Sequence, residues 1–360
     1  MNFRLHGFGQ ASTVSAFALA CAVLAGCGGG EEARSSGTTA SASPAIETAA
    51  AAAVNDEKPQ ALRKVLRRYT KKGITAVSLS PDGSSVAVSR ADGTVRVLDA
   101  GSLVDVEKFS AKLDTVAAGV AFSNNGKYLG VVGRDSDVHV YNIASANKLY
   151  TLHGHEHPIR TIAQSPNGAL IATAGDETRV MLWNSATGKL ARILSGHTGF
   201  VNSVAFSPDG TLLASADAEA RILVWKVGTG KLIHTLRGHA DEVYAIAFHP
   251  GGKVLASAGA DGQVLMWDLD SGVRTKAFEG HKKPARSIAF SPDGNTLASG
   301  GEDGQIMVWN AATGMLDKQL TASGSPVNSL VFGGKNKNLL FAGSDDNRFV
   351  RWNVASGIGK

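Results

Sequence analysis

The residues Gly238–Asp270, GHADEVYAIAFHPGGKVLASAGADGQVLMWDLD, contain the pattern that decides the fold. Short runs of apolar and small residues alternate there with turn sequences built from glycine, proline and aspartate. A further run follows at Val273–Phe278, after the turn sequence Asp270-Ser271-Gly272. Runs of this length between tight turns predict short antiparallel strands. In this unit the first three predicted strands are Val243–Phe248, Val254–Ala258 and Val264–Leu269, and the run Val273–Phe278 is the fourth.

The same pattern recurs along the chain. Five tryptophans lie 42, 42, 42 and 43 residues apart, at Trp183, Trp225, Trp267, Trp309 and Trp352. Nearly the same interval leads back to Tyr141 and Leu98, which makes seven units. A period of this size is typical of one supersecondary unit repeated in a stack or a ring. Four short strands in each of seven units predict an all-β fold, a seven-bladed β-propeller of four-stranded antiparallel blades.

Two recurring dipeptides mark the units. Gly-His precedes the first predicted strand at Gly154-His155, Gly196-His197, Gly238-His239 and Gly280-His281. Trp267-Asp268 ends the third strand of the fifth unit, and other units have Trp-Asn or Trp-Lys there. In these features residues 62–355 resemble the WD-repeat family. The resemblance implies a propeller that binds proteins around the mouth of its central channel.

The two ends of the repeated region predict how the ring closes. The seventh unit ends soon after its third strand, and Leu62–Tyr69 precedes the first unit where a fourth strand would lie. We therefore expect Leu62–Tyr69 to be the outer strand of the last blade. The surrounding basic run has two interpretations, either protection of an edge strand or contact with lipid headgroups or polysaccharide. Its cations are Arg63, Lys64, Arg67, Arg68, Lys71 and Lys72.

A histidine, a hydroxyl residue, an acid and a tryptophan recur at constant spacing. The sets are His239, Ser257, Asp261, Trp267 and His281, Ser299, Asp303, Trp309 in units five and six, and His155, Thr173, Glu177, Trp183 and His197, Ser215, Glu219, Trp225 in units three and four. A hydrolase needs one such set beside an oxyanion hole, whereas repeated sets predict buried hydrogen-bond chains. We expect no catalytic residue among them. Units one, two and seven have Thr70, Leu113 and Ser323 at the histidine position, so we expect those blades to be held less firmly.

Charge and histidine content point to no further ligand. A net charge of +5 over 360 residues is modest and does not indicate nucleic acid. His153, His155 and His157 have a spacing that zinc could use, but His155 already belongs to a hydrogen-bond chain. We expect no metal and no cofactor, and the sequence leaves open whether this histidine run binds metal.

The first 60 residues predict export and anchoring. Arg4 precedes an uncharged segment, Ala11–Gly26, of the length of a signal-peptide core. It ends in Leu24-Ala25-Gly26-Cys27, which resembles the lipobox of bacterial lipoproteins. The resemblance implies a signal peptide at 1–26 and lipidation of Cys27; Gly28 after the cysteine implies the outer membrane, facing the periplasm, with the inner membrane as the alternative. A plain secretory signal, or a cytoplasmic protein with an accidental lipobox, are the other interpretations. Residues 27–60 are of low complexity and predict a tether, leaving 61–360 as the propeller.

The partner-binding residues are expected where the units differ. The residues just before and just after the first apolar residue of each first strand vary widely between units, and the family resemblance places them at the channel mouth. The predicted partner-binding residues are Arg160, Phe200, Asn202, Glu242, Tyr244, Arg286 and Asn328. We expect a monomeric, non-enzymatic, membrane-anchored scaffold that binds a protein of the cell envelope. The alternative is an enzyme, or an enzyme's accessory propeller, acting on an envelope substrate.

Overall fold

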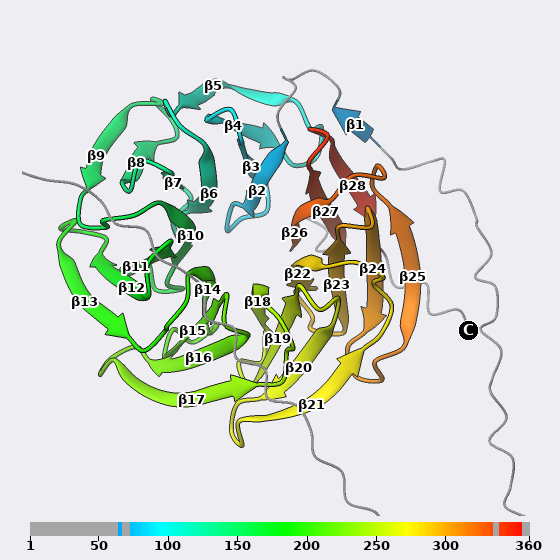
Figure 1. Cartoon of the computed structure of the whole chain (residues 1–360). Coiled ribbons are helices and arrows are strands. Elements are labelled where there is room, and N and C mark those ends of the chain that lie inside the picture. Colours follow the sequence, from blue (N-terminus) through cyan, green and yellow to red (C-terminus); the bar gives the residue numbers. More distant parts are fainter. Residues whose placement is uncertain (1–63, 67–72, 334–337, 355–360) are drawn as a thin grey trace, which may run out of the picture. The chain divides into compact units, whose positions relative to one another are not determined.

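The described part of the chain is made entirely of β-strands and their connections. The structure is a computed structural model that describes residues 64–66, 73–333 and 338–354. There, 28 strands form seven four-stranded antiparallel sheets and no helix (Figure 1). All 28 strands belong to one compact unit. The predicted all-β, seven-bladed propeller is confirmed.

Six sheets use four consecutive strands each. Sheets one and two contain β2 (Ile74–Leu79), β3 (Ser85–Arg90), β4 (Thr94–Asp99), β5 (Asp105–Lys112) and β6 (Ala117–Phe122), β7 (Tyr128–Gly133), β8 (Val138–Asn142), β9 (Lys148–Leu152). Sheets three and four contain β10 (Ile159–Gln164), β11 (Leu170–Gly175), β12 (Arg179–Asn184), β13 (Leu190–Ser195) and β14 (Val201–Phe206), β15 (Leu212–Asp217), β16 (Arg221–Lys226), β17 (Lys231–Arg237). Sheets five and six contain β18 (Val243–Phe248), β19 (Val254–Gly259), β20 (Val264–Asp268), β21 (Val273–Phe278) and β22 (Ala285–Phe290), β23 (Thr296–Gly301), β24 (Gln305–Asn310), β25 (Leu316–Thr321). The seventh sheet contains β26 (Val327–Gly333), β27 (Leu339–Ser344), β28 (Phe349–Asn353) and β1 (Lys64–Leu66). We number these sheets one to seven in this order.

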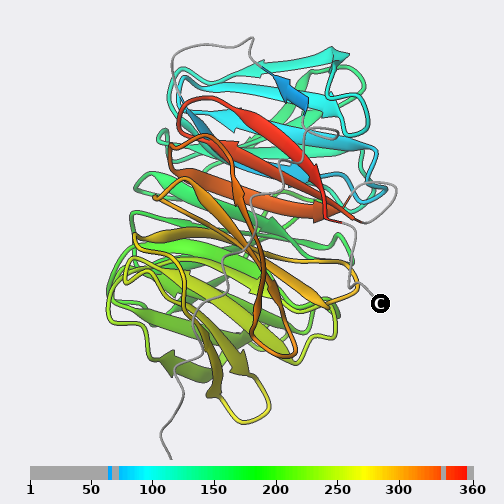
Figure 2. The same cartoon turned by 90° about the vertical axis from the view of Figure 1, so that its right-hand side faces the viewer.

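The sheets are arranged radially around a common centre (Figure 1). The first strand of each sheet lies near the centre and the fourth at the perimeter (Figure 1). Neighbouring first strands pack against one another around the ring, and β26 packs against β2. Seen from the side, the sheets lie face to face (Figure 2). The core is shared between neighbours: Trp267 of sheet five, for example, packs into a buried cluster with Ala214 and Val224 of sheet four.

The ring closes through the two ends of the repeated region. Strand β1 pairs antiparallel with β28, with Val65 opposite Val350. This confirms the predicted outer strand of the last blade over Lys64–Leu66. The rest of the predicted strand, at 62–63 and 67–69, lies outside the described residues. Without β1, the outer edge of β28 would be unpaired.

The predicted signal peptide, Cys27 and the tether lie outside the described residues. In the part of the chain that the structure describes, no helix is long and apolar enough to cross a membrane.

Candidate functional site

The first strand of every sheet contains a β-bulge near its start. Each strand shifts its register against the second strand after its first paired residue, so that one residue is left without a partner. A bulge redirects the side chain of the extra residue. The seven bulge residues are Thr75, Ala118, Arg160, Asn202, Tyr244, Arg286 and Asn328.

All seven bulge residues line one cavity of about 540 Å³. Because they belong to the first strands, which lie at the centre of the ring, this cavity lies there too, and we call it the channel mouth. The structure thus brings together six of the residues predicted to bind a partner: Arg160, Asn202, Glu242, Tyr244, Arg286 and Asn328. The seventh, Phe200, lines an adjoining hollow of about 330 Å³ that shares Asp176 with the mouth.

Arg160 links sheets three and four at the mouth. Its guanidinium forms an ion pair with Asp176, and its Nη1 donates to Asn202 Oδ1 at 3.1 Å. The same guanidinium lies over the ring of Phe200, 5.4 Å from the centroid. Asn202 Nδ2 in turn donates to the carbonyl oxygen of Val243 at 3.2 Å, which extends the chain of contacts to sheet five.

Arg286 occupies the equivalent position three sheets further on. Its Nε donates to Glu302 Oε1 at 2.7 Å and its Nη1 to Asn328 Oδ1 at 3.3 Å. The guanidinium lies 5.9 Å from the ring centroid of Tyr244. Burial raises the pKa of Tyr244, and Glu242 raises it further, so the phenol is neutral near pH 7.

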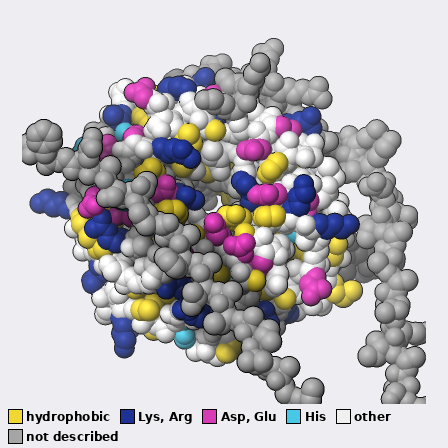
Figure 3. All heavy atoms as spheres, viewed as in Figure 1, with side chains coloured by type: hydrophobic (Ala, Val, Ile, Leu, Met, Phe, Trp, Pro, Cys, Tyr) yellow, Lys and Arg dark blue, Asp and Glu magenta, His cyan; other side chains and the backbone are white. Residues whose placement is uncertain are grey.

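Both arginines are oriented by neighbours yet remain accessible. The side chains of Arg160 and Arg286 keep 42% and 40% of their surface exposed. Each therefore presents a cation and an adjacent aromatic ring in a fixed geometry, which lowers the entropy cost of binding. Side chains of both charges lie around the centre of the ring on the face seen in Figure 3.

The sequence interpretation missed part of the mouth. Asp176 and Asp345 follow the second strands of their sheets and line the cavity, as does Arg134 at the corresponding place in sheet two. Glu302 has this place in sheet six and forms an ion pair with Arg286. In each of these sheets, the backbone N–H of this residue donates to the carbonyl oxygen of the residue just before the first strand. Asp176, for example, donates to the carbonyl oxygen of Pro158 at 2.8 Å. The same period of about 42 residues relates these positions, so the repeat alignment contained the signal.

The predicted hydrogen-bond chains form in sheets five and six. His239 Nε2 and Trp267 Nε1 both reach Ser257 Oγ, at 2.7 and 2.8 Å, while His239 Nδ1 faces both carboxylate oxygens of Asp261 at 3.0 Å. Sheet six repeats this with His281, Ser299, Asp303 and Trp309, at 2.8 Å from His281 to Ser299 and 3.0 Å from Trp309 to Ser299. The hydroxyl residues are completely buried, so these sets tie each blade together and offer no substrate access. Burial lowers the pKa of His239 and outweighs the opposing effect of Asp261, so the imidazole is neutral.

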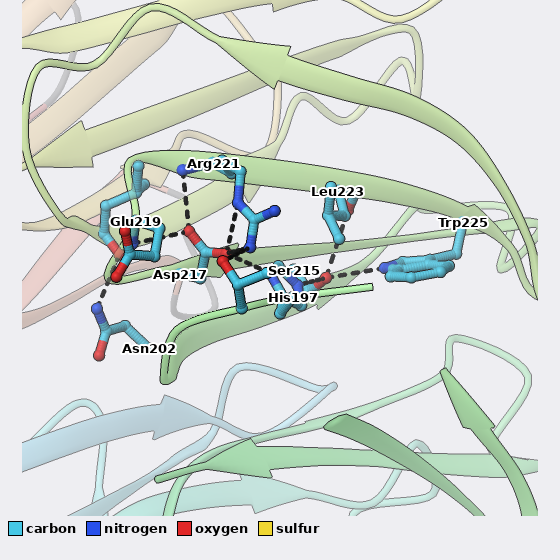
Figure 4. Close-up of polar contacts among 10 residues, drawn as sticks. His197, Asn202, Ser215, Asp217, Glu219, Arg221, Leu223 and Trp225 are labelled. Atoms are coloured by element: carbon cyan, nitrogen blue, oxygen red, sulfur yellow. Dashed lines mark hydrogen bonds and ion pairs between the residues drawn. The ribbon is translucent and has the colours of Figure 1, made fainter. Parts of the chain in front are cut away.

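Sheet three forms the predicted set, and sheet four differs from the prediction. His155 contacts Glu177 and lies 2.7 Å from Thr173 Oγ1. In sheet four the acid is Asp217 and not Glu219: His197 Nδ1 lies 2.7 Å from Asp217 Oδ2, and Glu219 is exposed (Figure 4).

The position of Asp217 explains why it replaces Glu219. Sheet five has Gly259 at the corresponding position, the last residue of the second strand. A Cβ at Gly259 would lie 2.6 Å from His239 Nδ1 and 2.8 Å from Asp261 Oδ1. A side chain at this position therefore begins beside the histidine, where the carboxylate is needed. Asp217 has that position in sheet four, so its carboxylate replaces the one expected from Glu219.

Two of the remaining sheets have partial substitutes for the set. In sheet two, His139 on the third strand lies 2.7 Å from Asp135 through Nε2, and its buried Nδ1 has no partner among the described residues. In sheet seven, Ser344 Oγ donates to Asp346 Oδ1 at 2.6 Å.

The side chains of His153 and His155 have separate partners and do not face one common point. His153 Nδ1 lies 2.7 Å from Asp137 Oδ1, and His155 belongs to the hydrogen-bond set of sheet three. The described residues contain no group of three or more His, Cys, Asp or Glu placed to hold a metal ion.

Comparison with known families agrees with this architecture. The model of a family described as "WD domain, G-beta repeat" matches residues 61–99, 146–184, 188–226, 230–268 and 272–310. These matches cover more than half of the chain. Each matched segment runs from the outer strand of one sheet through the first three strands of the next, as 61–99 does from β1 to β4.

Proposed function

Because this chain belongs to the WD-repeat family, we propose that it is an extracytoplasmic scaffold that binds a protein partner at the channel mouth. A WD-repeat propeller is typically a non-catalytic platform for protein interactions. The observation that carries the proposal is the pair of oriented, accessible arginines, Arg160 and Arg286, each beside an aromatic ring. Arginine and aromatic residues dominate the energetics of protein interfaces.

The partner surface is tested by the combined substitution Arg160→Ala, Tyr244→Ala and Arg286→Ala. We expect cross-linked partner recovery from intact cell envelopes to fall by about tenfold, because one interface residue of these types commonly contributes that much. The ion pairs lost are partly exposed, so the free energy of unfolding should fall by no more than about 2 kcal/mol in total. Thermal unfolding of the purified variant checks that it is folded.

A matched control replaces charges at the opposite ends of the strands. Lys253 and Asp270 form a 3.0 Å ion pair there, with side chains 75% and 69% exposed. The Lys253→Ala, Asp270→Ala variant should recover the partner as the unchanged protein does. Equal recovery by the mouth variant and this control would place the partner surface elsewhere.

We further propose that the propeller is attached to the bacterial cell envelope by a lipid on Cys27. The support is the sequence alone: an uncharged segment ends in Leu24-Ala25-Gly26-Cys27, and residues 27–60 have the low-complexity composition that predicts a tether. The proposed location is the outer membrane, facing the periplasm.

The anchor is tested by Cys27→Ala. The variant should incorporate no radiolabelled fatty acid, since the acyl acceptor is the missing thiol, and should be lost from the membrane fraction. Cys21→Ala is the matched control, because Cys21 lies within the segment to be removed and should leave labelling unchanged. Continued labelling of the Cys27 variant would contradict the lipoprotein proposal.

A further inference from the structure

Another cavity, of about 410 Å³, lies between sheets two and three. Its residues include Ser123, Asn124 and Asn125 in the turn between β6 and β7, and Asn167 in the turn between β10 and β11. These turns are at the opposite ends of the strands from the channel mouth, so the cavity is separate from the proposed partner surface. Within the described part of the chain, every residue that lines it is uncharged.

The cavity exists because sheet three departs from the repeat at Gln164. The last residue of β10 is Gln164, where Phe122, Phe206, Phe248, Phe290 and Phe332 stand in five other sheets. A phenylalanine fills space between neighbouring sheets, whereas the glutamine side chain is narrower and polar. Its Nε2 donates to the carbonyl oxygen of Gly168 at 3.2 Å.

The cavity is neutral because of two further departures. Tyr150 on β9 faces Val140, where the corresponding residues of four other outer strands are Arg192, His234, Lys276 and Lys318. Its hydroxyl donates to the carbonyl oxygen of Ser185 at 3.1 Å, and Arg192 donates to the corresponding turn of the next sheet, at the carbonyl oxygen of Thr229, at 2.8 Å. Asn125 and Asn167 occupy the turn position that Asp82, Asp209 and Asp293 occupy elsewhere.

The two asparagines have hydrogen-bond donors to spare. Asn167 Oδ1 accepts from Ser165 Oγ at 2.8 Å and from the backbone N–H of Ala169 at 3.0 Å. In the aspartate turns the second carboxylate oxygen also has a donor, as Asp209 has in Thr211 at 2.8 Å. In the asparagine turns, the Nδ2 group takes the place of that second oxygen. The Nδ2 groups of Asn125 and Asn167 have no hydrogen-bond partner among the described residues. Amide donors that line a cavity can bind hydroxyl or carbonyl oxygens.

From this lining we propose that the cavity between sheets two and three is a binding site for a neutral carbohydrate, of about the size of a disaccharide. A pyranose has an apolar C–H face and a rim of hydroxyl groups. The rings of Tyr128 and Tyr150 offer apolar surface with a polar edge, and the amides of Asn125, Asn167 and Gln164 offer donors and acceptors for hydroxyls. An anionic ligand would find no cation in the lining. Burial raises the pKa of Tyr150, and the nearby Tyr128 raises it further, so the tyrosine is neutral near pH 7.

The test is isothermal titration of the purified full-length protein with maltose, cellobiose and N,N′-diacetylchitobiose. Digalacturonic acid is the charged comparison, and an end-blocked Gly-Ser-Thr-Gly peptide represents an extended polypeptide. We expect at least one disaccharide to bind with a dissociation constant of about 1 mM or below, as suits an open site. Tyr150→Arg and Gln164→Phe each restore the residue type of the other sheets, so both variants should fold. Each should weaken binding by about tenfold or more, because the first removes the ring and the second fills the cavity.

Lys276→Arg is the matched control, since it changes the position equivalent to Tyr150 in sheet five. It should bind as the unchanged protein does. If Gln164→Phe fails to fold, Tyr150→Arg decides, because Tyr150 is 37% exposed and tolerates a longer side chain. The proposal is overturned if no disaccharide binds at about 20 mM, or if both variants bind normally. It is equally overturned if digalacturonic acid or the peptide binds more tightly than all three disaccharides.

Discussion

Replacing Asp217 with alanine is expected to lower the free energy of unfolding by about 3–5 kcal/mol, the range for breaking a buried ion pair from one side. The Asp217 side chain is completely buried. Its Oδ2 lies 2.7 Å from His197 Nδ1 and 2.8 Å from Arg221 Nη2, and its Oδ1 accepts from the backbone N–H of Arg221 at 3.0 Å (Figure 4). The substitution leaves a guanidinium and an imidazole without their shared acceptor. Chemical denaturation of the purified variant measures the loss.

Glu219→Ala is the matched control in the same turn. Glu219 is exposed and contacts Asp217 through its backbone N–H, at 3.0 Å, which alanine keeps, so the change should be within about 0.5 kcal/mol. Burial raises the pKa of Asp217, but the hydrogen bonds from His197 and Arg221 outweigh it, and the net pKa is lowered. The stability that Asp217 contributes is therefore present above its unfolded pKa and lost as the pH falls through the folded value. A larger loss for Glu219→Ala than for Asp217→Ala would reverse the assignment of the acid.

Deleting residues 61–70 is expected to lower the midpoint of thermal unfolding by about 5–10 °C, or to make the protein aggregate. The deletion removes β1, and with it the pairing of Lys64–Leu66 to Phe349–Arg351. Strand β28 then becomes an edge, although its residues Phe349 and Val350 are almost completely buried. The loss also disconnects the two ends of the repeated region, which sheet seven otherwise joins. Scanning calorimetry with light scattering measures both effects.

The control deletion is residues 28–55, which takes away a longer stretch of chain than the deletion of 61–70 but leaves β1 intact. This deletion should leave the unfolding midpoint unchanged. Equal midpoints for the two deletions would mean that the outer strand contributes nothing to closure of the ring.

The channel mouth could be anticipated from the repeat, although its contacts could not. Positions that vary between units were predicted to bind a partner, and Arg160, Tyr244 and Arg286 do line one cavity. That they bind a partner stays a prediction. The pairing of Arg160 with Asn202, and of Arg286 with Asn328, joins residues 42 positions apart in neighbouring sheets. These pairs depend on the bulges that redirect the side chains, and no local pattern marks a bulge.

The choice of acid in sheet four shows where counting along the chain is insufficient. Glu219 has the spacing of the acid in other units, and the structure uses Asp217. Counting along the chain assumes that the carboxylate beside the histidine comes from the same position of every unit. A hydrogen bond depends instead on where the oxygen lies, and Asp217 reaches the histidine from the position that is Gly259 in sheet five.

The sequence by itself determined the number of blades, the four strands in each, the turns between them and the strand that closes the ring. These features follow from the alternation of apolar residues and from the turn residues. Both signals depend on residues close together in the sequence, and both recur with the period of the repeat. Only the tertiary structure decided which carboxylate serves His197, which arginine contacts which asparagine, and where Gln164 and Tyr150 leave a neutral cavity. Those features arise between strands and between sheets, at distances set by packing around the closed ring, so they exist only once the chain has folded.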